Sequence, residues 1–382
     1  MKFIHLSDLH IGKRINNYSM IEDQKYIFNQ ILSIIHNEKP DALIIAGDIY
    51  DRSLPPTEAV TELDDFIVHL ADESFDTFII SGNHDSAVRL AFGSRIMSKS
   101  GIHISPVYNG TVEPYSLTDE YGTVNVYLLP FIKAFQVKDI FPERKDEINT
   151  NTEAIKIAIE NMNVDVSKRN IIVCHQFVAG ASKSESEVVF VGGSDNVDSS
   201  VFEPFDYTAL GHIHTPQCIG GNKTIRYCGT PLKYSFSEDK AKSVTVAELF
   251  EKGRIEIREI PLVPLRDMRT IKGEFDELYT QGLHDPNKDD YIRVILTDLY
   301  EIDQAMSKLK RVYPNIMELI YEKNKNRIFS DSTVSEESVS KNPLDLFDDF
   351  FKTRVNRNMN DNEKAYIKSI IEEIEEEDNA SD

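Results

Sequence analysis

Near its start the chain reads Phe3-Ile4-His5-Leu6-Ser7-Asp8-Leu9-His10. A short apolar run closed by polar residues is typical of a buried strand in an α/β protein. Asp8 and His10 are two residues apart, so in an extended chain they lie on the same face. We therefore predict a strand over residues 3–6 that delivers both side chains to one site.

The same arrangement, an apolar run followed by Asp, Asn or His, occurs four more times. The predicted strands cover residues 42–46, 77–80, 171–174 and 207–210. Loops at the ends of strands are the usual place for sites in α/β proteins. Oxygen and imidazole donors without thiolate suit Mn, Fe or Zn and argue against a closed structural zinc site. The five blocks together supply seven such side chains: Asp8, His10, Asp48, Asn83, His175, His212 and His214.

Glycines precede three of the ligand blocks, at Gly47, Gly82 and Gly211. A residue without Cβ allows a sharp turn and a close approach of main chain to a ligand. Taken singly, each block has an ordinary explanation as a polar turn, a cap or a buried core histidine. Five blocks, each directly after a strand-like run, favour a common site. The other histidines lack this context: His5, His36, His69, His103 and His284.

The order of these blocks resembles the motif set of the calcineurin-like metallophosphoesterases. The matching blocks are Asp8-x-His10, Gly47-Asp48-x-x-Asp51, Gly82-Asn83-His84-Asp85, His175 and Gly211-His212-x-His214. Within this superfamily, the chain is most similar to the nuclease subunits that bacteria combine with a coiled-coil ATPase. Those proteins are the counterparts of the double-strand-break repair nuclease of eukaryotes and archaea. The opening stretch, residues 229–238 and the C-terminal organisation carry the narrower resemblance.

The resemblance implies two divalent ions, with manganese as the expected metal, and a ligand set divided between them. Asp48 would bridge the ions. His84 is implied as the catalytic histidine, which protonates the leaving oxygen or stabilises the charged transition state. Asp51 is expected to orient His84 by placing its carboxylate on the far ring nitrogen. One ion would take Asp8, His10, Asp48 and His214, and the other Asp48, Asn83, His175 and His212.

The implied function is a manganese-dependent DNA nuclease in DNA end processing, repair and recombination. It would act as a double-strand exonuclease and as a single-strand or hairpin endonuclease. Some archaeal relatives carry histidine at the position of Asp51, and Asp51-Arg52 also resembles the Ser/Thr protein phosphatases. A phosphatase or cyclic-nucleotide phosphodiesterase with the same two ions is therefore the alternative. A non-catalytic scaffold is disfavoured because His84 and Asp51 are present beyond the ligand set.

The charge of the chain is unusual for an enzyme that acts on DNA. It contains 64 acidic and 42 basic residues, a net charge of −22. Because strong phosphate binding normally needs a basic surface, we expect a partner to supply much of the DNA affinity. No apolar run approaches the roughly 20 residues of a membrane helix. The absence of a signal peptide and the unpaired spacing of three cysteines favour the cytoplasm.

The pattern of apolar residues predicts four parts in the 382 residues. Residues 1–262 are expected to form a two-sheet α/β sandwich, with helices over 26–35 and 58–70. Strands over 224–228, 244–249 and 255–260 are assigned to the second sheet. Residues 263–323 read as a small capping domain of order β-α-β-α-β. A polar linker over 324–341 precedes a C-terminal helical segment, residues 342–382.

Two surfaces are expected to bind partners. In the C-terminal segment, apolar residues recur at helical spacing, and two short helices cannot bury such faces by themselves. The resemblance implies that they bind the coiled-coil base of the ATPase; folding back on the capping domain is the alternative. Apolar residues over 63–70 and 90–97 suggest a homodimer within a heterotetramer, or else core packing. The two C-terminal stripes are Leu344, Phe347, Phe350 and Phe351, and Ile367, Ile370, Ile371 and Ile374.

Overall fold

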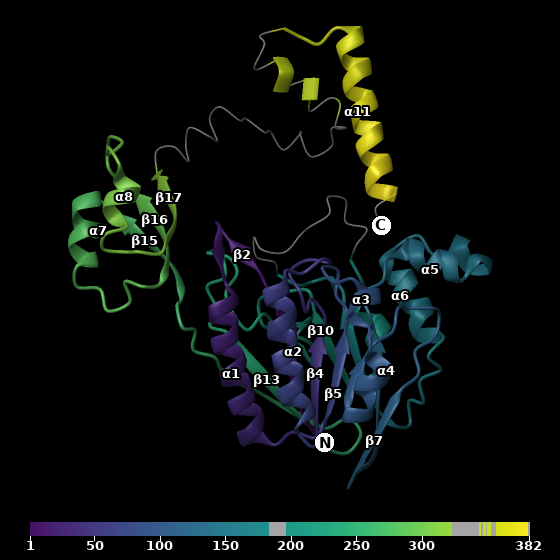
Figure 1. Ribbon diagram of the computed structural model, residues 1–382. Helices are drawn as coiled ribbons and strands as arrows, with labels where there is room; N and C mark the ends of the chain where they lie inside the picture. Colours follow the sequence, from purple (N-terminus) through teal and green to yellow (C-terminus); the bar gives the residue numbers. More distant parts are fainter. Residues whose placement is uncertain (183–195, 323–343, 345–346, 349, 353–356, 381–382) are drawn as a thin grey trace. The chain divides into compact units, whose positions relative to one another are not determined.

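The computed structural model (Figure 1) describes residues 1–382 except 183–195, 323–343, 345–346, 349, 353–356 and 381–382. The chain divides into two compact units. One comprises Met1–Val294 and Asp303–Leu319, and the other comprises Ile295–Ile302 and Ile320–Asp382. The linker predicted over 324–341 lies outside the described residues. The predicted domain boundaries do not coincide with this division and stay a prediction.

The first six-stranded sheet has the order β14-β13-β1-β4-β5-β6. Its central strands β1, β4, β5 and β6 are parallel to their neighbours. β13 pairs antiparallel with β1, and β14 pairs antiparallel with β13. The strands are β1 (Lys2–Leu6), β4 (Ala42–Ala46), β5 (Asp76–Ile80), β6 (Ile102–Ile104), β13 (Ser243–Leu249) and β14 (Ile255–Pro261).

The second six-stranded sheet has the order β11-β12-β10-β9-β8-β7. β8, β9, β10 and β12 are parallel to one another, and β7 and β11 pair antiparallel at the two edges. The strands are β7 (Tyr115–Asp119), β8 (Gly122–Leu129), β9 (Arg169–His175), β10 (Tyr207–Gly211), β11 (Gln217–Ile219) and β12 (Asn222–Tyr227).

The assignment of residues 244–249 and 255–260 to the second sheet was wrong. β13 pairs with β1 of the first sheet, where Phe3 lies opposite Ala247, and β14 extends that edge. β13 is buried on both faces, with Val246 and Ala247 in different core layers. Such a strand reads as a continuous apolar run that carries no mark of its neighbour. Its partner therefore had to come from the tertiary structure.

Three apolar layers hold the sandwich together. Alternate residues of both sheets, such as Phe3, Ile44 and Ile171, fill the space between the sheets. The outer face of the first sheet is covered by α1 (Ile21–Glu38) and α2 (Thr57–Ala71) (Figure 1). α5 (Ala134–Ile140) and α6 (Asn151–Glu160) contribute to the core on the other face of the second sheet. This confirms the predicted two-sheet α/β sandwich.

A third sheet, β15-β16-β17, follows the sandwich. Its strands and helices alternate in the predicted β-α-β-α-β order. Their bounds are β15 (Met268–Gly273), α7 (Phe275–Gly282), β16 (Tyr291–Leu296), α8 (Ala305–Leu309) and β17 (Ile316–Tyr321). The remaining elements are β2 (Arg14–Ile15), β3 (Tyr18–Ser19), α3 (Ala87–Leu90), α4 (Ser94–Met97), α11 (Asp361–Ala380) and 3₁₀ helices at Ser98–Ser100, Pro142–Glu147 and Ser199–Phe202.

Most apolar residues suggested for subunit pairing belong to the core. Leu63, Phe66, Leu70 and Leu90 are buried against the first sheet, because the helical stripe that carries them faces inward. The exposed apolar set lies on α2, on α3 and α4, and between these last two, and it includes Ile96, which was suggested for pairing. It consists of Val60, Val68, Val88, Phe92 and Ile96, of which Phe92 is 85% exposed. Among the described residues, no helix is both long and apolar enough to cross a membrane.

Candidate metal centre

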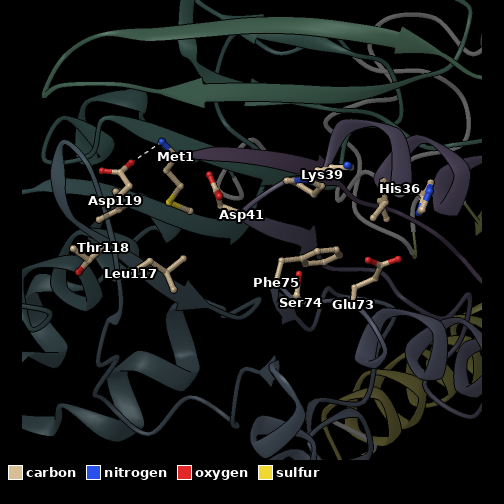
Figure 2. Close-up of a pocket in the computed structure, with 13 residues that line it drawn as sticks. Met1, His36, Lys39, Asp41, Glu73, Ser74, Phe75, Leu117, Thr118 and Asp119 are labelled. Carbon is tan, nitrogen blue, oxygen red and sulfur yellow. Dashed lines mark hydrogen bonds and ion pairs between the residues drawn. The ribbon is translucent and has the colours of Figure 1, made fainter.

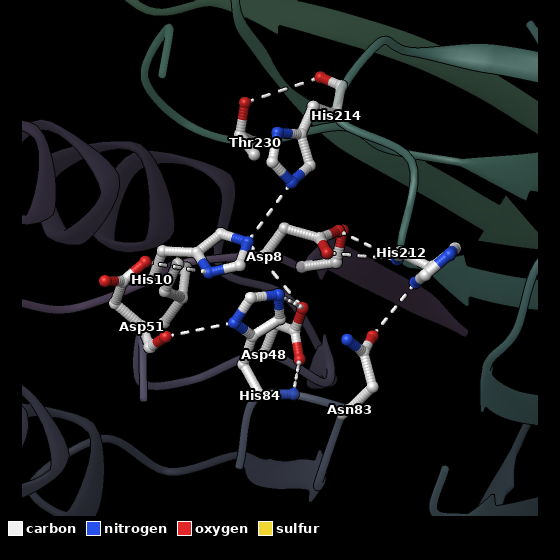
Figure 3. A network of polar contacts seen from close by, with 12 residues as sticks. Asp8, His10, Asp48, Asp51, Asn83, His84, His212, His214 and Thr230 are labelled. Atoms are coloured by element: carbon white, nitrogen blue, oxygen red, sulfur yellow. Dashed lines mark hydrogen bonds and ion pairs between the residues drawn. The ribbon is translucent and has the colours of Figure 1, made fainter. Parts of the chain in front are cut away.

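All seven predicted ligands follow, or end, strands at the carboxyl ends of the two sheets. β1, β4 and β5 are adjacent parallel strands of one sheet, and β9 and β10 are adjacent parallel strands of the other. The two sheet ends meet, because His175 Nδ1 lies 2.8 Å from the main-chain oxygen of Ala46. Parallel pairing thus gathers five loops that are far apart in the sequence into one site (Figure 3).

Asp8, His10 and His214 form one half of the site. Their ligand atoms lie within 4.8 Å of one another, and the Nε2 atoms of the two imidazoles are 3.1 Å apart. Asp8 accepts hydrogen bonds from Ser7 Oγ and from His212 N, the latter at 3.0 Å. The loops after β1 and β10 are thereby joined at a carboxylate that also faces the centre.

Asn83, His175 and His212 form the other half. The side-chain oxygen of Asn83 lies 3.0 Å from His175 Nε2 and 3.0 Å from His212 Nδ1. Asp48 lies between the halves, with Oδ2 3.4 Å from His175 Nε2 and 3.6 Å from His10 Nε2. This is the place at which a bridging carboxylate was predicted.

The contacts of His175 require a positive charge inside the site. Because Nδ1 donates to the carbonyl of Ala46, Nε2 must meet the oxygens of Asn83 and Asp48. Burial lowers the pKa of His175, but the nearby carboxylates of Asp48 and Asp8 outweigh it and raise the pKa to about 9. Either a proton or a metal ion can supply this charge. The donor set therefore fits divalent cations held by oxygen and nitrogen.

The electrostatics favour the protonation state that metal coordination needs at three predicted ligands, Asp48, His10 and His212, whereas burial raises the pKa of Asp8. Burial alone would raise the pKa of Asp48, but the imidazoles of His175, His10 and His84 hold it well below its usual range. Burial lowers the pKa of His10 far below its ordinary value and that of His212 to about 3. A charged Asp48 beside neutral His10 and His212 is the form that coordinates metal, whereas His175 must give up its proton when an ion binds.

Four of the ligand residues adopt left-handed backbone conformations. The φ angles are 52° at Asp8, 45° at His10, 50° at Asp48 and 103° at His212. Such conformations cost about 1–3 kcal/mol each in residues other than glycine, and they concentrate at functional sites. The fold therefore accepts strain at these four positions to turn the side chains inward.

The glycines before the ligands are needed for close packing, as the sequence suggested. A Cβ at Gly211 would lie 1.9 Å from the carbonyl oxygen of Ala46, and one at Gly82 would lie 2.1 Å from Asp48 Oδ1. Gly47 has a φ of +85°, and a Cβ there would lie 2.4 Å from His175 Nδ1. Any side chain at these positions would displace the loops that carry ligands.

His84 lies beside the two halves, but the predicted role of Asp51 requires a correction. His84 Nδ1 lies 3.0 Å from the main-chain oxygen of Asp51, and not against its carboxylate. The carboxylate lies 2.7 Å from Lys13 Nζ and 3.8 Å from His10 Nδ1. Asp51 N donates to the carbonyl of Ile11, and this pairing directs the Asp51 side chain toward Lys13.

Two carboxylates that support the site were not singled out from the sequence. Asp85 accepts hydrogen bonds from the backbone N–H groups of Ile49, Tyr50 and Gly82, and so joins the loops after β4 and β5. Glu238 Oε1 lies 3.5 Å from His214 Nδ1. Both residues belong to stretches that carried the family resemblance, but nothing in their local sequence indicates which group each one contacts.

A cavity of about 550 Å³ lies elsewhere in the molecule (Figure 2). Its lining includes Lys39, Asp41 and Phe75, which precede β4 and β5 and so lie at the amino ends of those strands. The predicted ligands follow the carboxyl ends of the same strands. This cavity is therefore separate from the metal centre.

Comparison with known proteins agrees with the fold. The family model of the calcineurin-like phosphoesterases matches residues 1–216, and this defines the class of the protein. A second model, described as the type 5 capsule protein repressor C-terminal domain, matches residues 264–355. The alignment with a solved dimetal phosphatase from Danio rerio covers 69% of this chain and 98% of that chain, with 12% identity and a TM-score of 0.40.

Two curated relatives narrow the class. The SbcD subunit of nuclease SbcCD from Staphylococcus epidermidis is 32% identical over 97% of this chain and 98% of its own length. The protein of the same name from Staphylococcus saprophyticus is 33% identical over 99% of both chains. The chain belongs to the SbcD family of nuclease subunits.

Proposed function

We propose that the protein is a DNA nuclease that uses two divalent ions, with manganese as the metal, and acts with an SbcC-type ATPase. The observation that carries the proposal is the position of His84 beside a two-part ligand cluster. Asp8, His10 and His214 would hold one ion, and Asn83, His175 and His212 the other, with Asp48 shared. Double-strand exonuclease and single-strand or hairpin endonuclease activities in DNA repair and recombination are what the family resemblance implies for it.

Each group has a defined task in phosphodiester hydrolysis. When bound, two divalent ions activate water for attack on phosphorus and offset the charge that develops on the phosphate. His84 is held through Nδ1 by Asp51, so Nε2 is the atom that faces the centre and donates a proton to the leaving oxygen. His84 Nε2 lies 3.9 Å from Asp48 Oδ2, the carboxylate that the two halves of the site share.

Partners would supply the DNA affinity that this acidic chain lacks. Phe347 is 37% exposed and Phe350 is 56% exposed in the C-terminal unit. Lys364 on α11 lies 2.8 Å from Asp348, which joins that helix to the segment carrying the phenylalanines. This exposed apolar surface supports the proposal that residues 342–382 bind the ATPase. The exposed set around Phe92 and Ile96 supports a homodimer within a heterotetramer. A cytoplasmic location stays a prediction.

Cleavage assays with the purified full chain test the proposal. The substrates are linear duplex DNA, a DNA hairpin and a phosphopeptide, with manganese or magnesium, and with or without the ATPase and ATP. We expect manganese-dependent cleavage of both DNA substrates and stimulation by the ATPase with ATP. Faster hydrolysis of the phosphopeptide than of DNA would identify a phosphatase instead. No hydrolysis of any substrate would overturn the proposed activity.

A further inference from the structure

A buried carboxylate lies directly behind one of the predicted ligands. His214 directs Nε2 toward His10 Nε2 at 3.1 Å, while its other ring nitrogen, Nδ1, lies 3.5 Å from Glu238 Oε1. The side chain of Glu238 is only 1% exposed. The Nε2 atom of His214 thus faces the candidate metal centre, and its Nδ1 atom faces the carboxylate of Glu238.

Lys242 fixes the position of this carboxylate. Its ammonium lies 2.5 Å from Glu238 Oε2 and also donates to the main-chain oxygen of His214 at 2.8 Å and to Thr230 Oγ1 at 2.7 Å. The backbone N–H of Tyr234 donates to Glu238 Oε1. One ammonium therefore holds both the carboxylate behind the ring and the backbone that carries the ring. Figure 3 shows Thr230 next to the main chain of His214.

The support of His214 differs from that of two neighbouring imidazoles. The outer nitrogens of His175 and His84 meet main-chain carbonyls, those of Ala46 and Asp51. His214 instead meets a side chain that carries a full negative charge. A carboxylate next to the outer nitrogen keeps the ring proton on that nitrogen. The inner nitrogen then offers its lone pair more strongly to a metal ion. The carboxylate also stiffens the ring against rotation.

We propose that Glu238 is a positioning residue for His214, held in place by Lys242, and that it sets the affinity of one ion of the pair. This inference rests on the metal centre of the proposed function. It distinguishes the two halves of the site, since Glu238 faces the half with Asp8, His10 and His214. The half with Asn83, His175 and His212 has a separate support in the carbonyl of Ala46.

Manganese titration of Glu238→Gln tests the inference without any activity measurement. Glutamine keeps the size of the side chain and one acceptor but removes the charge. Isothermal calorimetry and the electron paramagnetic resonance spectrum of Mn²⁺ report each bound ion. We expect two ions in the wild type, and in the variant one ion bound roughly 10–100-fold more weakly with the other unchanged. The matched control is Glu62→Gln, a buried carboxylate on α2 that faces Lys25, and should titrate as wild type.

A double variant separates this effect from misfolding. Glu238→Gln alone leaves the ammonium of Lys242 buried without its counter-ion, whereas Glu238→Gln with Lys242→Met removes both charges. We expect the urea midpoint of the double variant to be near that of the wild type. We also expect the double variant to bind one manganese ion weakly, as Glu238→Gln does. Wild-type affinity for both ions in the two variants would overturn the role of Glu238. Failure of the wild type to bind any divalent ion would overturn the proposed metal centre as well.

Discussion

The main-chain oxygen of Asp51 lies 3.0 Å from Nδ1 of His84 and holds the imidazole in place. The backbone of His84 is fixed by the same loop, since its N–H donates to Asp48 Oδ1 at 2.9 Å. Ring and backbone therefore both depend on the segment that follows β4. A main-chain acceptor survives substitution of its side chain, so the carboxylate of Asp51 and the orientation of His84 can be tested separately.

Replacement of His84 by alanine should slow DNA cleavage by roughly 10²–10⁴-fold, the range of general acid catalysis. Manganese binding should remain, because His84 is not among the seven predicted ligands. Single-turnover cleavage and calorimetric titration measure the two properties. Asp51→Asn should lose much less activity, because it keeps the main-chain oxygen. Loss of an ion from His84→Ala would instead identify His84 as a ligand, a role open to it through the group it forms with His10 and Asp48.

Replacement of Asp48 by alanine should remove both manganese ions and all cleavage together. Its carboxylate lies between the two halves of the site, within 3.6 Å of both His175 and His10. Metal content after gel filtration, measured by mass spectrometry, gives the stoichiometry. Asp64→Ala, at an exposed position on α2, serves as the control. Retention of one tightly bound ion would show that Asp48 does not bridge.

Replacement of Gly211 by alanine should destabilise the fold as well as the site. The added Cβ would lie 1.9 Å from a main-chain oxygen, that of Ala46, which cannot rotate away. Overpacking of this kind costs about 1–3 kcal/mol or more, and urea denaturation measures it. Gly253→Ala is the comparison, since a Cβ there has open space and only the strain of its φ of +83°. Equal losses at the two positions would argue against close packing at Gly211.

The ion pair between Asp119 and Arg169 should stabilise the fold in a pH-dependent way. Burial would raise the pKa of Asp119, but hydrogen bonds from Arg169 hold it below its ordinary value of 3.8. A lowered pKa contributes stability above pH 3.8 that is lost as the pH falls through the folded value. Asp119→Asn should therefore cost roughly 1–3 kcal/mol at pH 7 and less below pH 3.8.

Urea denaturation at pH 7 and pH 3 measures the contribution of Asp119. Asp139→Asn, at an exposed position on α5, controls for the loss of one negative charge from an acidic chain. A difference between wild type and Asp119→Asn that stays constant with pH would mean that the ion pair is not its source.

Substitutions on the two exposed apolar surfaces should each abolish binding of a different partner, the ATPase or a second copy of the chain. Phe347→Ser with Phe350→Ser should abolish co-purification of the SbcC-type ATPase and leave manganese-dependent cleavage of short substrates intact. Phe92→Ser with Ile96→Ser should shift the isolated protein toward the monomer in light scattering and retain the ATPase. Each pair is the control for the other. If either double variant lost both the ATPase and self-association, general misfolding would be the explanation, and circular dichroism would detect it.

The site was more predictable from the sequence than its surroundings. Asp8 and His10 follow an apolar run, and parallel pairing of such strands places their ends together, so local pattern was enough. The pairing of β13 with β1 was not predictable, because a strand buried on both faces does not mark its neighbour. The carbonyl of Asp51 and the carboxylate of Glu238 depend on contacts across 33 and 24 residues, respectively. Those contacts exist only in the folded chain.

The carboxylate of Asp85 accepts hydrogen bonds from the backbone N–H groups of Ile49, Tyr50 and Gly82. These bonds join the loops after β4 and β5 into one rigid corner. Asp48 and His84 lie on these two loops, so their separation is fixed when the protein folds. The loss of conformational entropy is then complete before metal or substrate arrives. Loosening this corner would slow the reaction even with every ligand and the acid still in the chain.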